Sequence, residues 1–147
     1  MTRRPLAILA LGAILSVSPA AIRAQRCRVA VGMTADGATA YMDVFEYDYV
    51  EDKPSFPGGE CRLVSYINDN RRYPAEAYRA GVEGRVLCSF IVNTDGKVSN
   101  VTVLRGVEPS LNKEAVRILS RMPQWSPGRI GGQSVPVRVV WAVPFRR

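Results

Sequence analysis

Alternating apolar and polar positions predict a β-hairpin in the second half of the chain. The first strand begins at Gly84 and presents one face made of Val86, Cys88, Phe90 and Val92 and another made of Arg85, Leu87, Ser89 and Ile91. Residues 93–96 form the turn, because the Asp95-Gly96 pair tolerates the positive φ of a tight turn. The return strand covers residues 97–104. Its alternation slips between Val98 and Val101, which predicts a β-bulge near Ser99 and Asn100.

A third strand is predicted at residues 135–143, after a helix at residues 110–122 that carries the chain back across the sheet. Such a crossover makes the last strand parallel to the second strand and antiparallel to the first. The predicted order is therefore 2-1-3, with the last strand at an edge. Pro136 lacks an N–H and Arg138 interrupts the outer face, and both features are typical of edge strands.

Helical periodicity completes an α+β fold, in which two to three helices cover one face of a three-stranded, antiparallel-type sheet. Residues 60–70 form one helix, with Leu63, Val64 and Ile67 on its buried face. A short helix follows Pro74 and ends before Gly81. Ser110 is predicted to cap the third helix, whose buried stripe is Leu111, Ala115, Ile118, Leu119 and Met122.

Upstream of this fold, residues 28–50 predict two strands around the Asp36-Gly37 turn, so an N-terminal strand or hairpin arm accompanies the three-stranded fold. Residues 43–49 alternate acidic and aromatic side chains, as in a half-exposed strand. Two interpretations stay open for this run. It is either an additional strand or packed arm, or a segment that covers the edge of the last strand.

The first 24 residues have the pattern of a secretory signal. Arg3 and Arg4 precede 12 apolar residues, Pro19 ends that run, and a cleavage site follows at Ala24. The predicted organisation is a signal at 1–24, an arm at 25–53 and a domain at 54–147, in the periplasm. The alternative is an uncleaved inner-membrane anchor, because residues 5–22 are uncharged over a length that can span a bilayer.

Charge argues against a nucleic-acid partner. The whole chain carries a net charge of +7, but three of its 20 basic residues lie in the signal. The remaining 17 basic and 13 acidic residues leave +4, and the arginines are mostly scattered, as on an ordinary solvated surface.

The titratable residues point away from catalysis. The chain has no histidine, so Ser-His-Asp and Cys-His nucleophile systems are excluded, and no zinc-ligand spacing is present. We therefore expect no enzyme activity, no metal and no cofactor. Of the three cysteines, Cys61 and Cys88 are candidates for one disulfide after export, and the alternative is that both are small buried apolar residues.

Short motifs in a fixed order carry a family resemblance over roughly the last ninety residues. They are Ser-Phe-Pro-Gly-Gly at 55–59, Tyr73-Pro74, Gly-Val-Glu-Gly at 81–84, Asp95-Gly96, Pro-Ser-Leu at 109–111, Trp-Ser-Pro-Gly at 125–128, and Pro136-Val137. Each motif is common by itself, but in this order and spacing they are specific. The chain resembles the C-terminal domain of the TonB family.

The resemblance implies a periplasmic docking domain that binds outer-membrane transporters, whose TonB box adds as a strand to the domain's edge. Carried over to this chain, the partner-binding residues are Val137, Arg138, Val139, Val140, Trp141 and Ala142, with Tyr73 and Pro74 close by. The family's membrane-helix histidine and long Pro-rich linker have no counterpart here, which indicates the docking half of a transducer. A regulatory or scaffold domain in envelope signalling is the alternative function, and homodimerisation stays open.

Overall fold

A computed structural model describes residues 26–147 of the 147-residue chain, so the predicted signal at 1–24 lies outside the described residues. The elements in chain order are β1 (Arg26–Met33), β2 (Thr39–Glu46), the short 3-10 helix η1 (Tyr47–Tyr49), α3 (Glu60–Asn70), α4 (Ala75–Arg79), β3 (Gly84–Val92), β4 (Val98–Arg105), α5 (Pro109–Ser120), β5 (Gly128–Ile130), β6 (Gln133–Val135) and β7 (Val137–Phe145). The fold is α+β, as the sequence predicts, and its helices and predicted strands lie within a few residues of the expected bounds.

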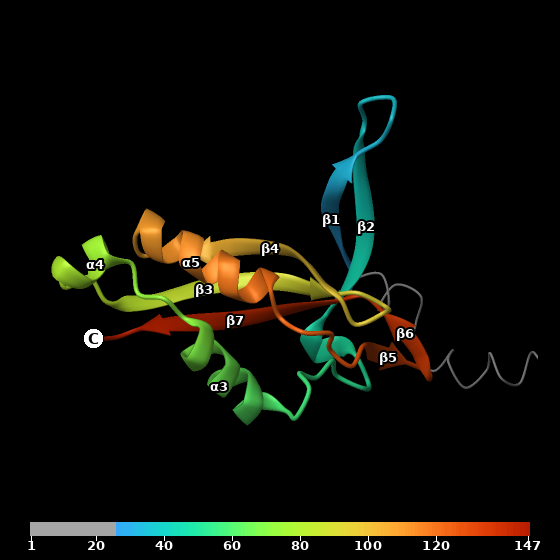
Figure 1. The fold of residues 1–147 in the computed structure, drawn as a ribbon. Coiled ribbons are helices and arrows are strands. Elements are labelled where there is room, and N and C mark those ends of the chain that lie inside the picture. The colour runs from blue at the N-terminus through green and yellow to red at the C-terminus, as the bar shows by residue number, and fades with distance from the viewer. Residues whose placement is uncertain (1–25) are drawn as a thin grey trace, which may run out of the picture.

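The main sheet of the described residues has five strands in the order β1-β2-β7-β3-β4 (Figure 1). Strand β3 pairs antiparallel with β4 on one side and with β7 on the other. The predicted order 2-1-3 of these three strands is therefore confirmed. The prediction of a three-stranded sheet is too small, because β1 and β2 form the N-terminal hairpin and β2 joins the sheet beside β7.

The last strand is displaced by two residues from its predicted bounds. Val135 belongs instead to β6, where it pairs with Gly128 of β5. Pro136 separates the two strands, because it has no N–H to donate to a ladder. The strand then continues past Val143 to Phe145, which is fully buried.

The turn between β3 and β4 depends on Gly96. Its φ is 86°, and a Cβ atom added there would lie 1.9 Å from the carbonyl oxygen of Trp125. The Trp125 N–H donates to the Gly96 carbonyl at 2.8 Å, which ties this turn to the loop after α5. The predicted bulge is confirmed, since the β3–β4 register shifts opposite Ser89 and Ile91, and Asn100 has a positive φ of 51°.

Two details of the predicted helices are wrong. Glu108, not Ser110, is the N-cap of α5, because Pro109 already occupies the first helical turn, and the Ser110 hydroxyl is buried without a hydrogen-bond partner among the described residues. Val64 is 45% exposed, so α3 buries only Leu63 and Ile67.

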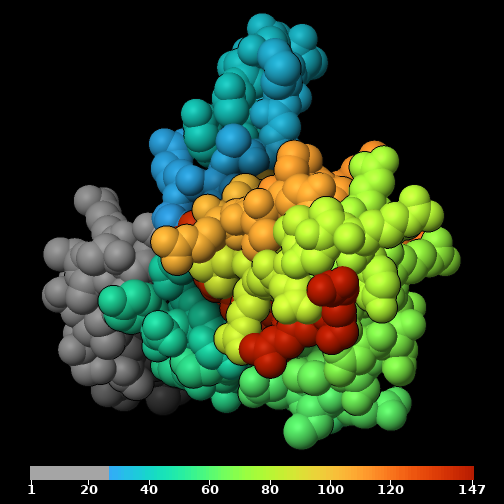
Figure 2. Space-filling view, turned by 90° about the vertical axis from the view of Figure 1, so that its left-hand side faces the viewer, coloured from blue at the N-terminus to red at the C-terminus, as the bar shows by residue number. Residues whose placement is uncertain are grey.

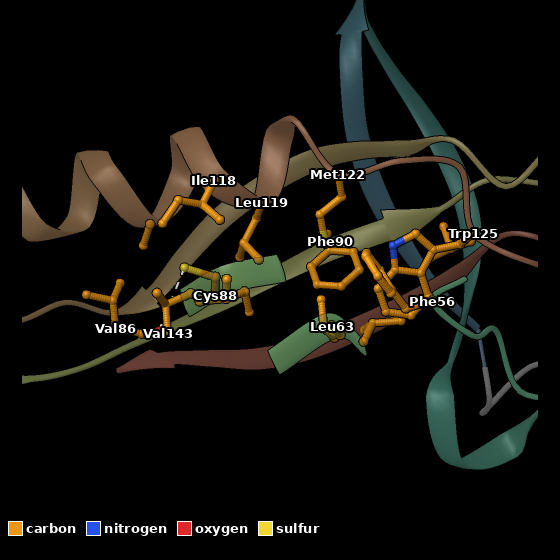
Figure 3. Close-up of a cluster of buried hydrophobic side chains, with 14 of the residues drawn as sticks. Phe56, Leu63, Val86, Cys88, Phe90, Ile118, Leu119, Met122, Trp125 and Val143 are labelled. Carbon is orange, nitrogen blue, oxygen red and sulfur yellow. Dashed lines mark hydrogen bonds between the residues drawn. The ribbon is translucent and has the colours of Figure 1, made fainter. Parts of the chain in front are cut away.

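The core lies between the helices and one face of β3 and β7 (Figure 3). Phe90 of β3 packs edge-on against Trp125 at 5.3 Å between ring centroids, and Phe56 meets the same indole at 5.8 Å. Residue Phe56 comes from the segment before α3, and the Ser55–Ser126 bridge fixes that segment beside the loop of Trp125. Phe56 is thus the residue of the Ser-Phe-Pro-Gly-Gly motif that belongs to the core.

The β1–β2 hairpin stands away from this body as an arm (Figures 1 and 2). Its tip exposes Val31, Met33 and Tyr41, and Met33 is 75% exposed. At its base, β2 runs parallel to the start of β7 through the pairs Phe45–Val137 and Glu46–Arg138. Both interpretations of residues 43–49 are therefore partly correct: residues 43–46 end the hairpin, Phe45 and Glu46 occupy the first part of the β7 edge, and residues 47–49 form η1.

Candidate strand-docking site

Strand β7 has two different sides. Toward β3 it is paired along its whole length, from Val92–Val137 to Gly84–Phe145. On the other side, β2 meets only Val137 and Arg138. Within residues 26–147, β7 has no strand partner on that side from Val139 onward. The prediction that residues 135–143 form one unpaired edge is therefore wrong for Val135, which pairs with Gly128, and for Val137 and Arg138, which pair with β2. It is correct from Val139 to Val143.

The hydrogen bonds at the two ends of β7 show which residues point outward. The Pro136 carbonyl accepts the Phe45 N–H at 2.9 Å, and the Pro144 carbonyl accepts Arg71 Nη1 at 2.6 Å. Both bonds lie on the side away from β3. Because backbone groups in a strand alternate sides from one residue to the next, the even-numbered residues of β7 face outward. Val140 and Ala142 thus present an N–H and a carbonyl to the open edge.

Each end of the open edge is closed by a side chain. At the start, Arg138 forms a salt bridge with Glu46 of β2 at 2.9 Å. At the end, Pro144 has no N–H, and Arg71 occupies its carbonyl. The segment left between them, from Val139 to Val143, is about 17 Å long at about 3.3 Å per residue. That length suits one short extended segment.

A cavity of about 470 Å³ lies beside the start of this edge. Val139, Val140 and Trp141 line its β7 wall. Its remaining apolar lining is Phe56, Leu63, Trp125 and Pro54, and its charged lining is Glu46, Asp48, Glu60 and Arg138. The sequence motifs identified the strand, but Asp48, Glu60 and Arg71 were missed, because they come from segments whose approach to β7 is set by tertiary packing.

The predicted partner-binding residues divide into backbone and side-chain groups. The side chains of Val137 and Val139 are buried in the core, and that of Trp141 packs against it. Arg138, Val140 and Ala142 lie on the opposite face, and Val140 is 44% exposed. Only this second group has both outward backbone atoms and accessible side chains.

Tyr73 and Pro74 lie at the far end of β7. The Tyr73 ring packs edge-on against Phe145 at 5.7 Å and against Tyr78 at 5.3 Å, and its hydroxyl donates to the Val82 carbonyl. Pro74 is the N-cap residue of α4. The structure therefore places the pair next to the Pro144 end of the open edge, and not beside Val137–Trp141.

All three cysteines of the described residues are free thiols. Cys61 is exposed on α3, whereas Cys88 is fully buried, and burial raises the pKa of its thiol to about 11. No Cys61–Cys88 disulfide is present in this structure. The alternative that both are small buried apolar residues is correct for Cys88 and wrong for Cys61.

Two further properties concern residues 26–147 as a whole. No group of three or more His, Cys, Asp or Glu side chains is arranged to hold a metal ion there. In the same residues, no helix combines the length and apolar composition needed to cross a membrane.

The second half of the chain matches a known protein family. The family model described as the C-terminal region of the Gram-negative bacterial TonB protein covers residues 69–146. The TonB proteins of Helicobacter pylori strains J99 and 26695 are each 39% identical over 44 residues, which is 30% of this chain. These matches cover only 16% and 15% of the two relatives.

The solved structures that resemble this chain include two solution structures of the Helicobacter pylori TonB C-terminal domain. One has a TM-score of 0.46 and 24% identity, over 58% of this chain and 89% of that domain. The other has a TM-score of 0.43 and 26% identity, over 59% of this chain and 80% of that domain.

Proposed function

Because this chain belongs to the family of Gram-negative bacterial TonB C-terminal domains, we propose that it is an exported docking module that binds an extended segment of an outer-membrane transporter or another envelope protein. The segment adds as a strand to the open part of β7, next to Val140 and Ala142. The proposed activity is binding, without catalysis and without a cofactor.

The observation that carries this proposal is the unpaired backbone of β7. Two N–H groups and two carbonyls at Val140 and Ala142 face outward without a strand partner in the described residues. An unpaired strand edge is a template for another strand, and main-chain hydrogen bonds supply most of the affinity when a segment is added. The closed ends at Arg138 and Pro144 fix the length of the added segment.

Export supports the same role. Residues 1–24 carry the secretory pattern, and we propose that the mature chain consists of the arm at 25–53 and the docking domain at 54–147, in the periplasm. Anchoring in the inner membrane is the alternative location. Mass and N-terminal sequence of protein from the cell envelope distinguish cleavage after Ala24 from retention of the segment.

A regulatory or scaffold role in the envelope is the second candidate function. The arm favours it, because residues 26–46 lie outside the matched family region and expose Val31, Met33 and Tyr41 at the tip. Capture from solubilised envelopes separates the two functions. Transporters on the bait support docking for transport, and sensor or peptidase proteins without transporters support the scaffold.

The direct test is a titration of isotope-labelled protein with transporter N-terminal segments, followed by backbone amide shifts. The largest shifts are expected at Val140 and Ala142, with smaller shifts at the Tyr73–Pro74 end. Shifts confined to residues 43–49, or none on β7, would contradict strand addition at this edge.

A further inference from the structure

Three arginines gather at the Pro144 end of the open edge. Arg71, Arg85 and Arg146 line a groove of about 310 Å³ together with Asn68 and Pro144. Arg71 is held by the Pro144 carbonyl and by Asn68. Among the described residues, Arg85 and Arg146 have no ion-pair partner. This end of the molecule, where the C-terminal residues emerge between α3 and the α4–β3 segment, faces the viewer in Figure 2.

The other end of the open edge has the opposite charge. Three carboxylates and one guanidinium line the 470 Å³ cavity. Glu46 is neutralised by Arg138, whereas Asp48 and Glu60 have no ion pair within residues 26–147. The excess charge of the cavity lining is therefore negative, and its walls are apolar.

The two patches are aligned along one strand. Arg138 lies at the acidic cavity and Pro144 lies at the arginine groove. Six residues of extended chain separate these two positions by about 20 Å. Val140 and Ala142 lie between them and supply the outward backbone groups. A segment that pairs with these two residues has one end beside the arginines and its other end beside the acidic cavity.

We propose that the open edge selects a bipolar extended segment, with an aspartate or glutamate beside Arg71, Arg85 and Arg146, and a lysine or arginine whose side chain enters the cavity of Asp48 and Glu60. The inference rests on the proposed function and specifies which extended segments the open edge binds.

Main-chain pairing alone accepts almost any extended sequence, so side-chain contacts have to supply the selection. Complementary charge at the two ends provides such selection. The cavity also suits a long basic side chain, because Phe56 and Leu63 pack along its methylene stem while Asp48 and Glu60 meet the charged head.

Three capped hexapeptides test the charge pattern. All share the centre Ser-Val-Thr-Val; one has lysine first and aspartate last, one has these ends exchanged, and one has glutamine and asparagine at the ends. In amide-shift titrations of the full chain, at least one charged peptide should bind about threefold to tenfold more tightly than the neutral peptide, as expected for two rim ion pairs. The advantage should disappear in 0.5 M salt.

A nitroxide next to the aspartate reports where the acidic end lies. The nitroxide should broaden the amide resonances of residues around Arg85 and Arg146 and leave the amide resonances of Asp48 and Glu60 sharp. Broadening at the cavity instead, or equal affinity of all three peptides, overturns the inference while strand addition stands. Failure of all three peptides to shift the Val140 and Ala142 amides overturns strand addition and the inference together.

Matched variants separate charge from folding. Glu60→Gln and Arg85→Gln should each remove about half of the advantage of the charged peptide and leave the neutral peptide unchanged. Glu76→Gln on α4 and Arg105→Gln on β4 are the controls, since both are exposed and line neither patch. Equal losses in the controls and in the test variants would show a nonspecific charge effect and overturn the inference.

Discussion

Val140 and Val139 are neighbours in sequence with opposite backbone roles. The Val140 N–H points to the open edge, whereas the Val139 N–H points toward β3, where Val139 pairs with Phe90. Only the first is available to a partner. Removing the N–H of Val140 therefore tests partner binding, and removing the N–H of Val139 tests folding.

Val140→Pro should abolish binding of an added segment while the domain stays folded, because it removes an outward N–H. Val139→Pro should destabilise the fold by about 1–3 kcal/mol, because it removes a ladder hydrogen bond to β3 and leaves a buried group unpaired. Val140→Ala is the control for the side chain and should change the affinity by no more than about twofold. Titration and urea denaturation measure the two effects. Equal loss of stability in both proline variants would contradict the assignment of outward residues.

Cys61 and Cys88 should differ sharply in reactivity. At pH 8, a thiol with a pKa of about 11 is ionised in about one molecule in a thousand, and Cys88 is also inaccessible. Iodoacetamide should therefore modify Cys61 in the native protein and reach Cys88 only in denaturant. Peptide mapping of protein from the envelope reads out both sites. A Cys61–Cys88 disulfide in that map would contradict the free-thiol arrangement.

At the scale of elements, α5 holds the connector between α3 and α4 in place. Glu114 of α5 accepts the backbone N–H of Arg72 at 2.7 Å and two hydrogen bonds from Arg117. The connector also carries Arg71 and Tyr73, which contact the end of β7. A carboxylate on α5 thereby positions residues at the candidate site.

Glu114→Gln should lower the free energy of unfolding at pH 7 by about 1.5–3 kcal/mol, because its hydrogen bonds are charge-assisted. Burial acts to raise the pKa of the Glu114 carboxyl, but hydrogen bonds from Arg117 and the Arg72 N–H outweigh it, and the pKa lies below its ordinary value of 4.5. The stabilisation is therefore complete above the unfolded-state pKa and lost as the pH falls through the lower folded-state pKa.

Urea denaturation at pH 7 and at pH 3 measures this difference. The gap between wild type and Glu114→Gln should narrow at the lower pH. Glu76→Gln, on an exposed residue of α4, serves as the control and should show little effect at either pH. A gap that stays constant with pH would mean that the carboxylate charge contributes nothing.

At the scale of the whole molecule, the sequence predicts those features of the fold that local patterns determine. The β3–β4 turn follows from Asp95-Gly96, and the order of β4, β3 and β7 follows from one helical crossover. The β2–β7 contact was not predictable, because two residue pairs join segments about ninety positions apart and leave no periodic pattern. The acidic cavity was missed for the same reason, since Asp48 follows the β2–β7 contact and Glu60 comes from α3, and both lie far from β7 in sequence.

Few contacts tie the arm to the body. Phe45 donates its N–H to the Pro136 carbonyl, Glu46 pairs with Arg138, and Asn100 donates a side-chain N–H to the Ala30 carbonyl. Val44 and Phe45 are buried at the base of the hairpin, whereas residues 28–43 are mostly solvent-exposed. A two-stranded hairpin without a packed face is marginally stable, so the part of the hairpin beyond this base should open without unfolding the domain.

Hydrogen exchange tests this independence. Amides of residues 28–33 and 39–43 should exchange by local opening, with a free energy several kcal/mol below that of the β3 amides, which require global unfolding. Low concentrations of urea should accelerate exchange in β3 and leave the arm almost unchanged, because local opening exposes little new surface. If the hairpin and β3 share one opening free energy and one urea dependence, the hairpin is an integral part of the folded domain, and its description as a separate arm is wrong.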